Sequence, residues 1–365
     1  MTTTPVEINK YSLKKNDVLF NRTNTVDLVG KTAIYKGEYP AIYTGYLIKI
    51  NNNEDILNSE YLNYVLNSHQ IKSYNRLVLS VAVSQANINA QKLKTYPIPI
   101  PPSIGEQTAI ANALSDVDAL LTELENLIAK KQAMKTATMQ QLLTGKTRLP
   151  QFAYHEVATN TEGAVEGKRK GTKPSELGEI PEDWGVGKLN DVCFSFKTGK
   201  LDANAMKKDG EYRFYTCARE HYYIDHYAFD TEALLVSGNG ANVGYVHYFK
   251  GKFNAYQRTY VLSGFNADVK YLKIYLEEKL AERIRVEVNS GNTPYITMDT
   301  LTDMLIALPA KGEQNAIANM LSDMDNEIQT LEQRLSKTRQ IKQGMMQELL
   351  TGKTRLPFDK IADKE

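Results

Sequence analysis

The chain has 365 residues, of which 42% are hydrophobic, and this composition is ordinary for a soluble globular protein of two or three domains. Its net charge of +1 excludes a protein that grips DNA through charge alone, and its two cysteines exclude a disulfide scaffold. No apolar run reaches the roughly 20 residues of a membrane span and no signal peptide opens the sequence, so we expect a cytoplasmic protein.

Residues 1–103 are predicted to form a mixed α/β domain. Short alternating apolar runs separated by turn residues indicate strands, and a longer periodic run indicates a helix. The predicted elements are a strand at 17–20, strands within VGKTAIYKGEYPAIYTGYLI (29–48) that turn at Lys36-Gly37, one helix in YLNYVLNSHQI (61–71), and the polar loop SQANI (84–88). Pro101-Pro102 then mark the entry to a long helix.

Residues 104–150 predict that long helix. The stretch GEQTAIANALSDVDALLTELENLIAKKQAMKTATMQQLLTGKTRLP (105–150) has apolar residues at alternating steps of four and three, which is the a/d seam of a coiled coil. A helix of about 39 residues would be about 58 Å long at 1.5 Å per residue. The seam residues are Ile110, Leu114, Val117, Leu121, Leu124 and Ile128.

The Gly-Lys-Thr that closes this stretch is not predicted to bind a nucleotide. A phosphate-binding P-loop needs a glycine five positions earlier, on a loop that leaves a strand. Gln140 stands there, and Gln347 stands at the same place in a second copy of the motif. Both copies end an amphipathic pattern, so Gly145 and Gly352 are predicted to be helix C-caps that tolerate positive φ.

Residues 151–175 are predicted to be a linker because they are rich in Gly, Thr and charged residues and have no periodicity. The run Lys168-Arg169-Lys170 could contact phosphate. A solvated linker is the favoured interpretation, since isolated charge runs usually are solvated.

The rest of the chain repeats the first part. Residues 312–357 match 105–150 without a gap at an offset of 207, and 243–262 match 29–48 more weakly. We therefore predict a second α/β domain at 176–310, with a turn at Lys250-Gly251, a second long helix at 311–357 and a tail at 358–365. The second seam consists of Ile317, Leu321, Met324, Ile328, Leu331 and Leu335. Two matching seams in one chain favour an intramolecular antiparallel pair over a homodimeric zipper.

Three features could suggest chemistry, and each has a simpler interpretation. SGNGANVG (237–244) follows the strand ALLV, but an alternating run follows it where a dinucleotide loop would open a helix, so strand–turn–strand is favoured. Cys193, Cys217, His221 and His226 fit no common zinc spacing. The string Asn292-Thr293-Pro294-Tyr295 lacks the second proline of an adenine-methyltransferase motif. We predict no catalytic site, no metal and no cofactor.

The order of parts resembles the DNA-specificity subunits of type I restriction-modification systems. It consists of a recognition domain and a helix that opens with GEQ and closes with QQLLTGKTRL, then a second copy of both. ELGEIPEDWGVGKLNDV (176–192), with Pro181 and Trp184, looks like the usual opening of that family's domains. The resemblance covers nearly the whole chain.

The resemblance implies two mixed α/β target-recognition domains joined by two long helices in an antiparallel intramolecular coiled coil, related by a pseudo-twofold. Each domain would read one half of a split, asymmetric site in double-stranded DNA. The partners would be two modification subunits that carry the methyltransferase and restriction subunits that translocate and cleave. The chain itself would be a recognition and assembly subunit without catalytic activity.

The first domain departs from that pattern because much less chain precedes the strand at 17–20 than precedes ALLV (233–236), and no Trp-containing opening is present there. Either the first domain is a shortened variant, or the chain starts inside a longer original domain. The alternative function is therefore a truncated or decoy subunit that binds modification subunits but reads one half-site, with or without dimerisation.

Candidate DNA-contacting residues lie in the polar loops, because Arg, Lys, Asn, Gln, Ser and Thr carry the groups that read base edges. Arg258 is the preferred candidate because it aligns with Thr44 in a block where the flanking residues match. The two domains therefore keep this position but carry different side chains there. The candidates in the second domain are Lys197, Thr198, Lys200, Arg219, Asn239, Asn242, Gln257, Arg258, Asn292, Thr293 and Tyr295. Those in the first domain are Asn21, Arg22, Asn24, Tyr43, Thr44, Ser84, Gln85 and Asn87.

Overall fold

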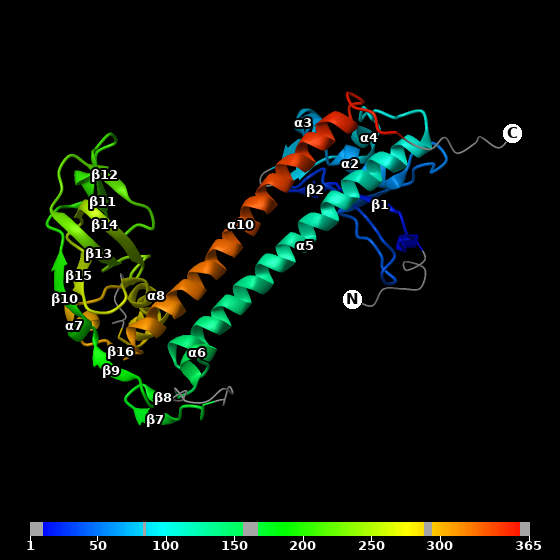
Figure 1. The fold of residues 1–365 in the computed structure, drawn as a ribbon. Helices are drawn as coiled ribbons and strands as arrows, with labels where there is room; N and C mark the ends of the chain where they lie inside the picture. Colours follow the sequence, from blue (N-terminus) through cyan, green and yellow to red (C-terminus); the bar gives the residue numbers. More distant parts are fainter. Residues whose placement is uncertain (1–9, 83–84, 156–166, 288–293, 358–365) are drawn as a thin grey trace. The chain divides into compact units, whose positions relative to one another are not determined.

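The protein is represented by a computed structural model that describes residues 10–82, 85–155, 167–287 and 294–357, and it divides into two compact units (Figure 1). Unit 1 consists of Met1–Ala129 and Thr330–Glu365, and unit 2 of Lys130–Gln329. Each unit contains one mixed α/β domain and a segment of each long helix, α5 (Ile104–Leu143) and α10 (Lys311–Leu349).

Unit 1 contains two small antiparallel sheets. In the first, β1 (Val18–Asn21) lies between β3 (Thr32–Ile34) and β4 (Leu47–Ile50). The second has the order β2-β6-β5, and short helices accompany the sheets. These elements are β2 (Thr23–Asn24), β5 (Ser80–Ala82), β6 (Gln85–Asn87), α2 (Ser59–Leu66), α3 (His69–Val78) and α4 (Ala90–Leu93). Apolar residues of β1 and α2 pack with the start of α5 and the end of α10 in one core.

The single helix predicted for residues 61–71 is wrong, because this segment forms two helices, α2 and α3, that are interrupted at Asn67 and Ser68. Ser68 is extended, with φ −68° and ψ 159°, and its hydroxyl caps α3 by accepting a bond from the Ile71 N–H. Asn67 ends α2 and its side-chain amide donates to the Thr32 carbonyl at 3.0 Å. Short polar side chains that bond the backbone compete with the helix ladder, which explains the break at these two residues.

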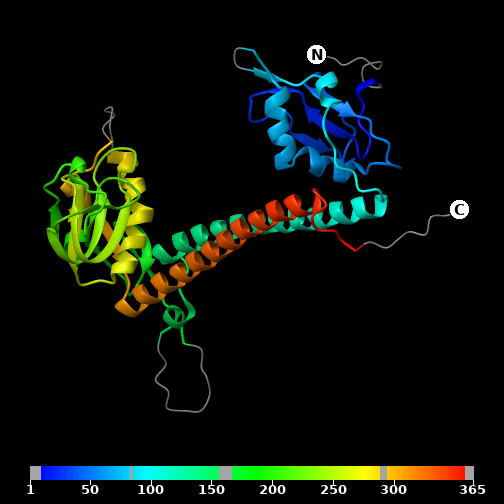
Figure 2. The same ribbon diagram turned by 90° about the horizontal axis from the view of Figure 1, so that it is seen from above.

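Unit 2 is built on a six-stranded sheet of order β10-β15-β13-β14-β11-β12, in which the β11–β14 pair is parallel and the others antiparallel. The strands are β10 (Cys193–Thr198), β11 (Tyr212–Tyr215), β12 (Tyr222–Ile224), β13 (Phe229–Ser237), β14 (Val246–Ala255) and β15 (Thr259–Phe265). Leu234, Val236 and Leu262 belong to the core that contains α8 (Val269–Glu287), which covers one face of the sheet (Figure 2).

The central strands of the two units have the same topology. In unit 2, β13 pairs antiparallel with β14 on one side and β15 on the other, as β1 pairs with β3 and β4 in unit 1. The turn predicted at Lys250-Gly251 is wrong: β14 runs through these residues and pairs with β13 from Val246 to Phe253. The strand–turn–strand prediction for SGNGANVG is confirmed, with Gly240 and Gly244 at φ of 80° and 82°.

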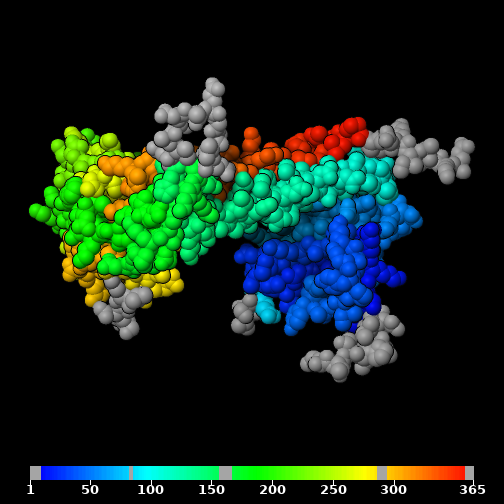
Figure 3. Space-filling view, turned by 60° about the horizontal axis from the view of Figure 1, so that its bottom comes forward, coloured from blue at the N-terminus to red at the C-terminus, as the bar shows by residue number. Residues whose placement is uncertain are grey.

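Several described residues of the predicted linker 151–175 form secondary structure. β7 (Thr172–Ser175) lies within it and pairs with β8 (Gly178–Pro181), and Arg169 forms a β-bridge with Tyr154. In the space-filling view the green part of unit 2 adjoins the teal end of α5 (Figure 3). The remaining elements of unit 2 are α6 (Pro150–Ala153), β9 (Gly185–Lys188), α7 (Leu189–Val192), the 3₁₀ turn η1 (Ala203–Ala205), α9 (Met298–Thr302) and β16 (Leu305–Leu308).

The two long helices are confirmed, with 40 and 39 residues. In unit 1, Asp118 and Glu125 of α5 form ion pairs with Lys342 and Arg339 of α10, and in unit 2 Lys131 and Lys135 pair with Glu327 and Asp325. The α10 number falls as the α5 number rises, so each pair of segments is antiparallel. The seam residues Ile110, Leu114, Leu124, Ile317, Leu321 and Ile328 are buried, and the other six are partly buried. No helix in the described ranges has the apolar length needed to cross a membrane.

The repeated motifs at the helix ends bind each other. Gly145 and Gly352 cap α5 and α10 with φ of 68° and 70°, as predicted for helix ends. The arginine that follows each glycine binds the glutamate of GEQ on the other helix: Arg148 Nε donates to Glu313 at 2.9 Å, and Arg355 Nε to Glu106 at 2.8 Å. The same ion pair is thus made twice, once in each unit.

The glutamine of GEQ joins each long helix to its α/β domain. Gln107 donates to the Pro101 carbonyl at 3.0 Å and accepts from the Asn58 N–H at 2.8 Å. Gln314 donates to the Pro309 carbonyl at 2.8 Å and accepts in the same way from Asp268, which precedes α8. Asn58 caps α2, so the glutamine fixes the start of the domain helix in both units.

Candidate nucleic-acid interface

Five loop segments of unit 2 that contain predicted site residues are joined by hydrogen bonds, most of them between backbone groups. Their centre is the tight turn between β14 and β15, where the Thr259 N–H donates to the Tyr256 carbonyl at 2.8 Å. The Arg258 carbonyl in this turn accepts from the Gly238 N–H at 2.8 Å and lies 3.5 Å from the Cys217 sulfur. The turn therefore holds two other loops through its backbone and leaves the Arg258 side chain exposed.

Glycine is needed where these loops meet, because their backbones approach more closely than a side chain allows. A Cβ on Gly238 would lie 2.3 Å from the Arg258 carbonyl oxygen, and one on Gly199 would lie 1.8 Å from the Ala255 carbonyl oxygen. Distances this short do not occur for real Cβ atoms, so the backbone would have to move. The glycines of SGNG and KTGK thus set the positions of the polar residues beside them.

Asn239 and Tyr295 come together although 56 positions separate them in the sequence. They form an isolated antiparallel β-bridge, and the Gly240 N–H donates to the Pro294 carbonyl at 3.0 Å. Asn239 is partly buried, while Tyr295 keeps 51% of its surface exposed. Two other candidates, Asn292 and Thr293, lie outside the described residues.

Arg219 and Asn242 also meet. Asn242 donates to the Cys217 carbonyl at 3.0 Å and accepts a long bond of 3.4 Å from Arg219 Nε. The Arg219 guanidinium lies 5.7 Å from the centre of the Tyr245 ring, which is within cation–π range. Tyr245 was not among the predicted site residues, and the sequence signal for it was only its place just after the glycine-rich loop.

The remaining candidates of unit 2 line the same region. Thr198 ends β10 and pairs with Tyr260, and the Gln257 N–H donates to the Leu201 carbonyl at 2.9 Å. Lys197, Lys200, Gln257 and Arg258 are exposed. No carboxylate in the described part of the chain forms an ion pair with Lys197, Lys200 or Arg258, so their charges remain free to bind an anion.

Two histidines near the interface, His221 and His247, lie in a cluster of aromatic rings. His247 Nε2 lies 2.9 Å from the Ala218 carbonyl, and its ring packs 5.1 Å from that of Tyr215. Burial lowers the pKa of His247 and, together with the Arg213 charge, that of His221, so both rings are neutral at pH 7. Within the described ranges, no group of three or more His, Cys, Asp or Glu residues could hold a metal ion.

Unit 1 brings several of its candidates together through the β2–β6 pair. Asn24 lies opposite Ala86, and Asn87 donates to the Thr23 hydroxyl at 2.6 Å. The Arg22 carbonyl accepts from the Ile88 N–H at 2.9 Å, which joins β1, β2 and β6 in one edge. Asn21 donates to the Leu28 carbonyl at 3.2 Å, Gln85 is exposed, and Ser84 lies outside the described residues.

The loop before β4 completes this edge. The Arg22 N–H donates to the Tyr46 carbonyl at 3.0 Å, and the Leu47 N–H to the Thr44 carbonyl at 3.0 Å, so Thr44 lies in the turn beside Arg22. Tyr46 is 66% exposed and was not predicted. Tyr43 instead packs edge-on against Tyr11, with ring centres 5.4 Å apart.

The two interfaces differ in what they offer a ligand. Unit 2 presents guanidinium, ammonium, amide and phenol groups at one end of a sheet with six strands. The described residues of unit 1 contain no counterparts of β10, β11 and β12, and Arg22 is their main cation near the edge. Exposed Arg, Lys and Gln side chains, with partly buried Asn side chains beside them, carry groups that match the donors and acceptors on base edges and phosphates.

Comparison with known proteins identifies the repeat. The family described as "Type I restriction modification DNA specificity domain" matches residues 2–135 and 181–340. The chain is 37% identical over 174 residues to the type I restriction enzyme EcoDI specificity subunit of Escherichia coli, a match that covers 48% of this chain and 38% of that protein. It is 30% identical over 371 positions to the MjaX specificity subunit of Methanocaldococcus jannaschii, which covers 96% of this chain and 81% of that one.

Solved structures show the same fold at low sequence identity. The S subunit of a type I restriction-modification system from M. genitalium aligns with a TM-score of 0.58 and 16% identity over 93% of this chain and 84% of its own. A chain from a structure concerned with complex assembly and conformational transition of the type I R-M system aligns with a TM-score of 0.53 and 15% identity, over 93% of this chain and 82% of its own.

Proposed function

The chain belongs to the family of type I restriction-modification DNA-specificity subunits, and from that premise we propose that it reads a bipartite, asymmetric site in double-stranded DNA. The observation that carries the proposal is the duplication itself. Two domains share one three-stranded topology, and each gathers polar loop residues at the end of its sheet. Two different sets of side chains on two equivalent frames suit two different half-sites.

In this proposal the long helices fix the separation of the half-sites. Each is a continuous helix of about 60 Å, longer than the roughly 34 Å of one DNA turn, so a spacer without base contacts fits between the halves. Charged pairs along the helices and the two Glu–Arg pairs at their ends keep them in one register. Spacing would then be set by helix length and would not vary with DNA sequence.

The chain would act as a recognition and assembly subunit and leave catalysis to its partners. Two modification subunits would bring the methyltransferase, and restriction subunits would bring translocation and cleavage. The outward faces of α5 and α10 and the Thr-Gly-Lys-Thr-Arg ends are the candidate docking surfaces for the modification subunits. Cytoplasmic location follows from this role, because the target is cellular or invading DNA.

A second candidate function is a subunit that docks modification subunits but reads one half-site. The observation in its favour is the smaller sheet system of unit 1, in which the described residues offer fewer strands and fewer cations than unit 2. Unit 2 would then do the reading, and the intact helices would still bind partners.

Methylation mapping tests both functions. The chain would be expressed with its modification subunit in a host that lacks other DNA methylation, and modified adenines would be located by sequencing. A split motif with two defined halves is expected if both units read DNA. A single defined half, or a symmetric motif, would favour the second candidate. A stable complex that methylates nothing would contradict the first proposal and support a decoy.

A further inference from the structure

The segment from Ile180 to Trp184 packs against the ion pair between Arg148 and Glu313 in unit 2 and hydrogen-bonds to both residues. Trp184, which is 1% exposed, donates from its indole nitrogen to Glu313 at 3.0 Å. Asp183 accepts two hydrogen bonds from Arg148, at 2.8 and 3.1 Å. Pro181 and Trp184 also pack closely against Gly145, where a Cβ would lie 2.3 Å from Pro181.

Among the described residues of unit 1, no segment occupies the equivalent place. Glu106 and Arg355 form the same ion pair, but the Arg355 side chain is 62% exposed, whereas that of Arg148 is 8% exposed. No heavy atom of the described residues lies within 4 Å of the position that a Cβ on Gly352 would take. Trp184 is the one tryptophan of the printed sequence, and it lies in unit 2.

The edge beside this place is also open. In unit 2, β16 pairs with β9, and the Tyr271 hydroxyl donates to the Ala307 carbonyl at 2.8 Å. In unit 1 the Tyr61 hydroxyl donates in the same way to the Pro99 carbonyl at 2.9 Å, so residues 97–100 correspond to β16. Within the described ranges no strand pairs with them.

The two prolines of this edge do not prevent pairing. The Ala307 N–H points away from β9 to the Tyr275 hydroxyl, at 3.2 Å, so the N–H groups of Ile306 and Leu308 are the ones that face β9. Their counterparts Ile98 and Ile100 keep their N–H groups. Pro97 and Pro99 stand where the N–H would face away, which is the arrangement tolerated in an edge strand.

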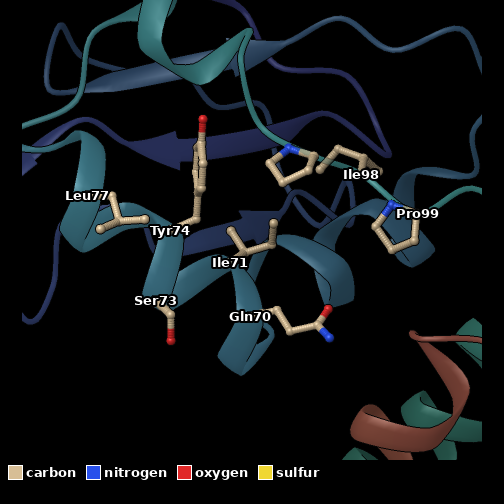
Figure 4. Close-up of a pocket in the computed structure, with 8 residues that line it drawn as sticks. Gln70, Ile71, Ser73, Tyr74, Leu77, Ile98 and Pro99 are labelled. Atoms are coloured by element: carbon tan, nitrogen blue, oxygen red, sulfur yellow. The ribbon is translucent and has the colours of Figure 1, made fainter.

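Two hollows flank the open edge. One, of about 240 Å³, is lined by Tyr61, Ile100, Glu106, Gly352 and Arg355 among others and lies where Pro181 and Trp184 sit in unit 2. The other, of about 580 Å³, lies between α3 and residues 97–99, with Ile71, Tyr74, Leu77 and Ile98 on its walls (Figure 4). Ile100 and Leu77 are 47% and 79% exposed.

We propose that this open edge of unit 1 is a docking site for a segment of a partner protein that carries Pro-x-Asp-Trp followed by an extended strand. Its tryptophan would enter the smaller hollow and donate to Glu106, and its aspartate would pair with Arg355. Its strand would add to residues 97–100, and the apolar residues that follow would cover the hollow beside α3. The argument is charge and shape complementarity, since unit 2 shows the same frame with such a segment in place.

A peptide with the sequence of residues 176–192 is the probe. Labelled with fluorescein, it would be titrated with the full-length chain, and binding would be followed by fluorescence anisotropy and by hydrogen exchange. We expect saturable binding that protects residues 97–101 and 351–355. A peptide with Trp184→Ala should bind at least about tenfold more weakly, because a buried tryptophan dominates such contacts. An Asp183→Asn peptide should also bind more weakly.

In unit 2 the Leu308 side chain lies next to Gly187 of β9. The protein variant Ile100→Asp puts a charge at the counterpart of Leu308 in unit 1, and it alters a side chain that is already exposed. It should abolish binding, while Ile42→Asp, at a similarly exposed isoleucine, should not. Absence of binding to the parent chain, or equal binding by Ile100→Asp, would overturn the proposal. A dimer of the free chain that Ile100→Asp dissociates would make a second copy the occupant and would also overturn it.

Discussion

Arg148, just beyond the end of one long helix, donates two hydrogen bonds to the carboxylate of Glu313 at the start of the other, at 2.9 and 2.6 Å. The Glu313 side chain is 1% exposed and also accepts from Trp184. A buried carboxylate held by an arginine fork and an indole is fully satisfied, and loss of one partner leaves a buried charge. This contact connects both long helices to the opening segment of the second domain.

Arg148→Ala should therefore destabilise unit 2 by about 3 kcal/mol, because it leaves Glu313 buried without its cation. Trp184 is the only tryptophan of the chain and lies in this contact, so urea unfolding followed by its fluorescence reports on unit 2. The matched variant Arg355→Ala should have the smaller effect, measured as hydrogen exchange in unit 1, since water already reaches Arg355. Equal losses in the two units would contradict this difference.

Arg258→Ala should weaken binding to the specific site by about 1–3 kcal/mol and relax specificity at one base pair, if its guanidinium reads a guanine edge. Lys200→Ala should weaken binding to specific and random DNA alike and reduce the salt dependence by about one charge. Arg285→Ala, in the last turn of α8, serves as the control. Anisotropy titrations at several salt concentrations measure all three. Unchanged affinity and methylation specificity in Arg258→Ala would exclude that residue.

Gly238→Ala should impair DNA reading without removing any polar side chain. The added Cβ would meet the Arg258 carbonyl oxygen at 2.3 Å and the Tyr260 ring at 2.8 Å, so the loop that carries Arg258 has to shift. Specific binding should fall at least about tenfold, with a stability loss of about 1–3 kcal/mol from overpacking. Gly344→Ala, in α10 and with free space around it, should leave binding intact. Full specific binding by Gly238→Ala would show that the loop position does not matter.

The parts of the fold that were predicted from the sequence are those that depend on residues close together in the chain. The a/d seam, the glycine caps and the alternating strands follow from periodicity and backbone chemistry over a few neighbouring residues. Arg148 and Glu313 lie far apart in the sequence, and neither the GEQ nor the TGKTR motif contains a local signal that one binds the other. The break at Asn67-Ser68 was missed because Asn67 is held by Thr32, a residue in another element, although the Ser68 cap of α3 is a local contact with Ile71.

The sequence predicted which polar loops carry the candidate DNA-contacting residues, but not how these loops contact one another. The polar loops of unit 2 meet around the turn that contains Arg258. The match between Thr44 and Arg258 predicted only that Arg258 contacts DNA, and that stays a prediction. Tyr245 and Tyr46 were missed because an aromatic residue next to a loop is common, and only the fold brings Tyr245 beneath Arg219. The continuous strand through Lys250-Gly251 was missed because Lys-Gly is a usual turn sequence, whereas pairing with β13 keeps it extended.

The stability of unit 2 should fall as the pH is lowered from 7.5 to 5.5. Burial holds the folded-state pKa of His247 below its usual value near 6.5, so the unfolded chain binds a proton first. The stabilisation is therefore complete above pH 6.5 and is lost as the pH falls through the folded pKa. Urea midpoints from Trp184 fluorescence at both pH values measure it. His247→Gln should flatten this dependence, and an unchanged slope in that variant would assign the effect to another group.

The helix seam should depend on buried residues and not on their exposed neighbours. Leu321 is fully buried in the core of unit 2, while Met320, the preceding residue of α10, is 42% exposed. Leu321→Ala should reduce the free energy of unfolding of unit 2 by about 2–5 kcal/mol, since it removes apolar contacts and leaves a cavity. Met320→Ala should change it by about 0.5 kcal/mol or less. Sedimentation should give a monomer of 41.1 kDa for both variants. A parent chain that sediments as a dimer, and Leu321→Ala that dissociates it, would show that the seam joins two molecules and that the intramolecular pair is wrong.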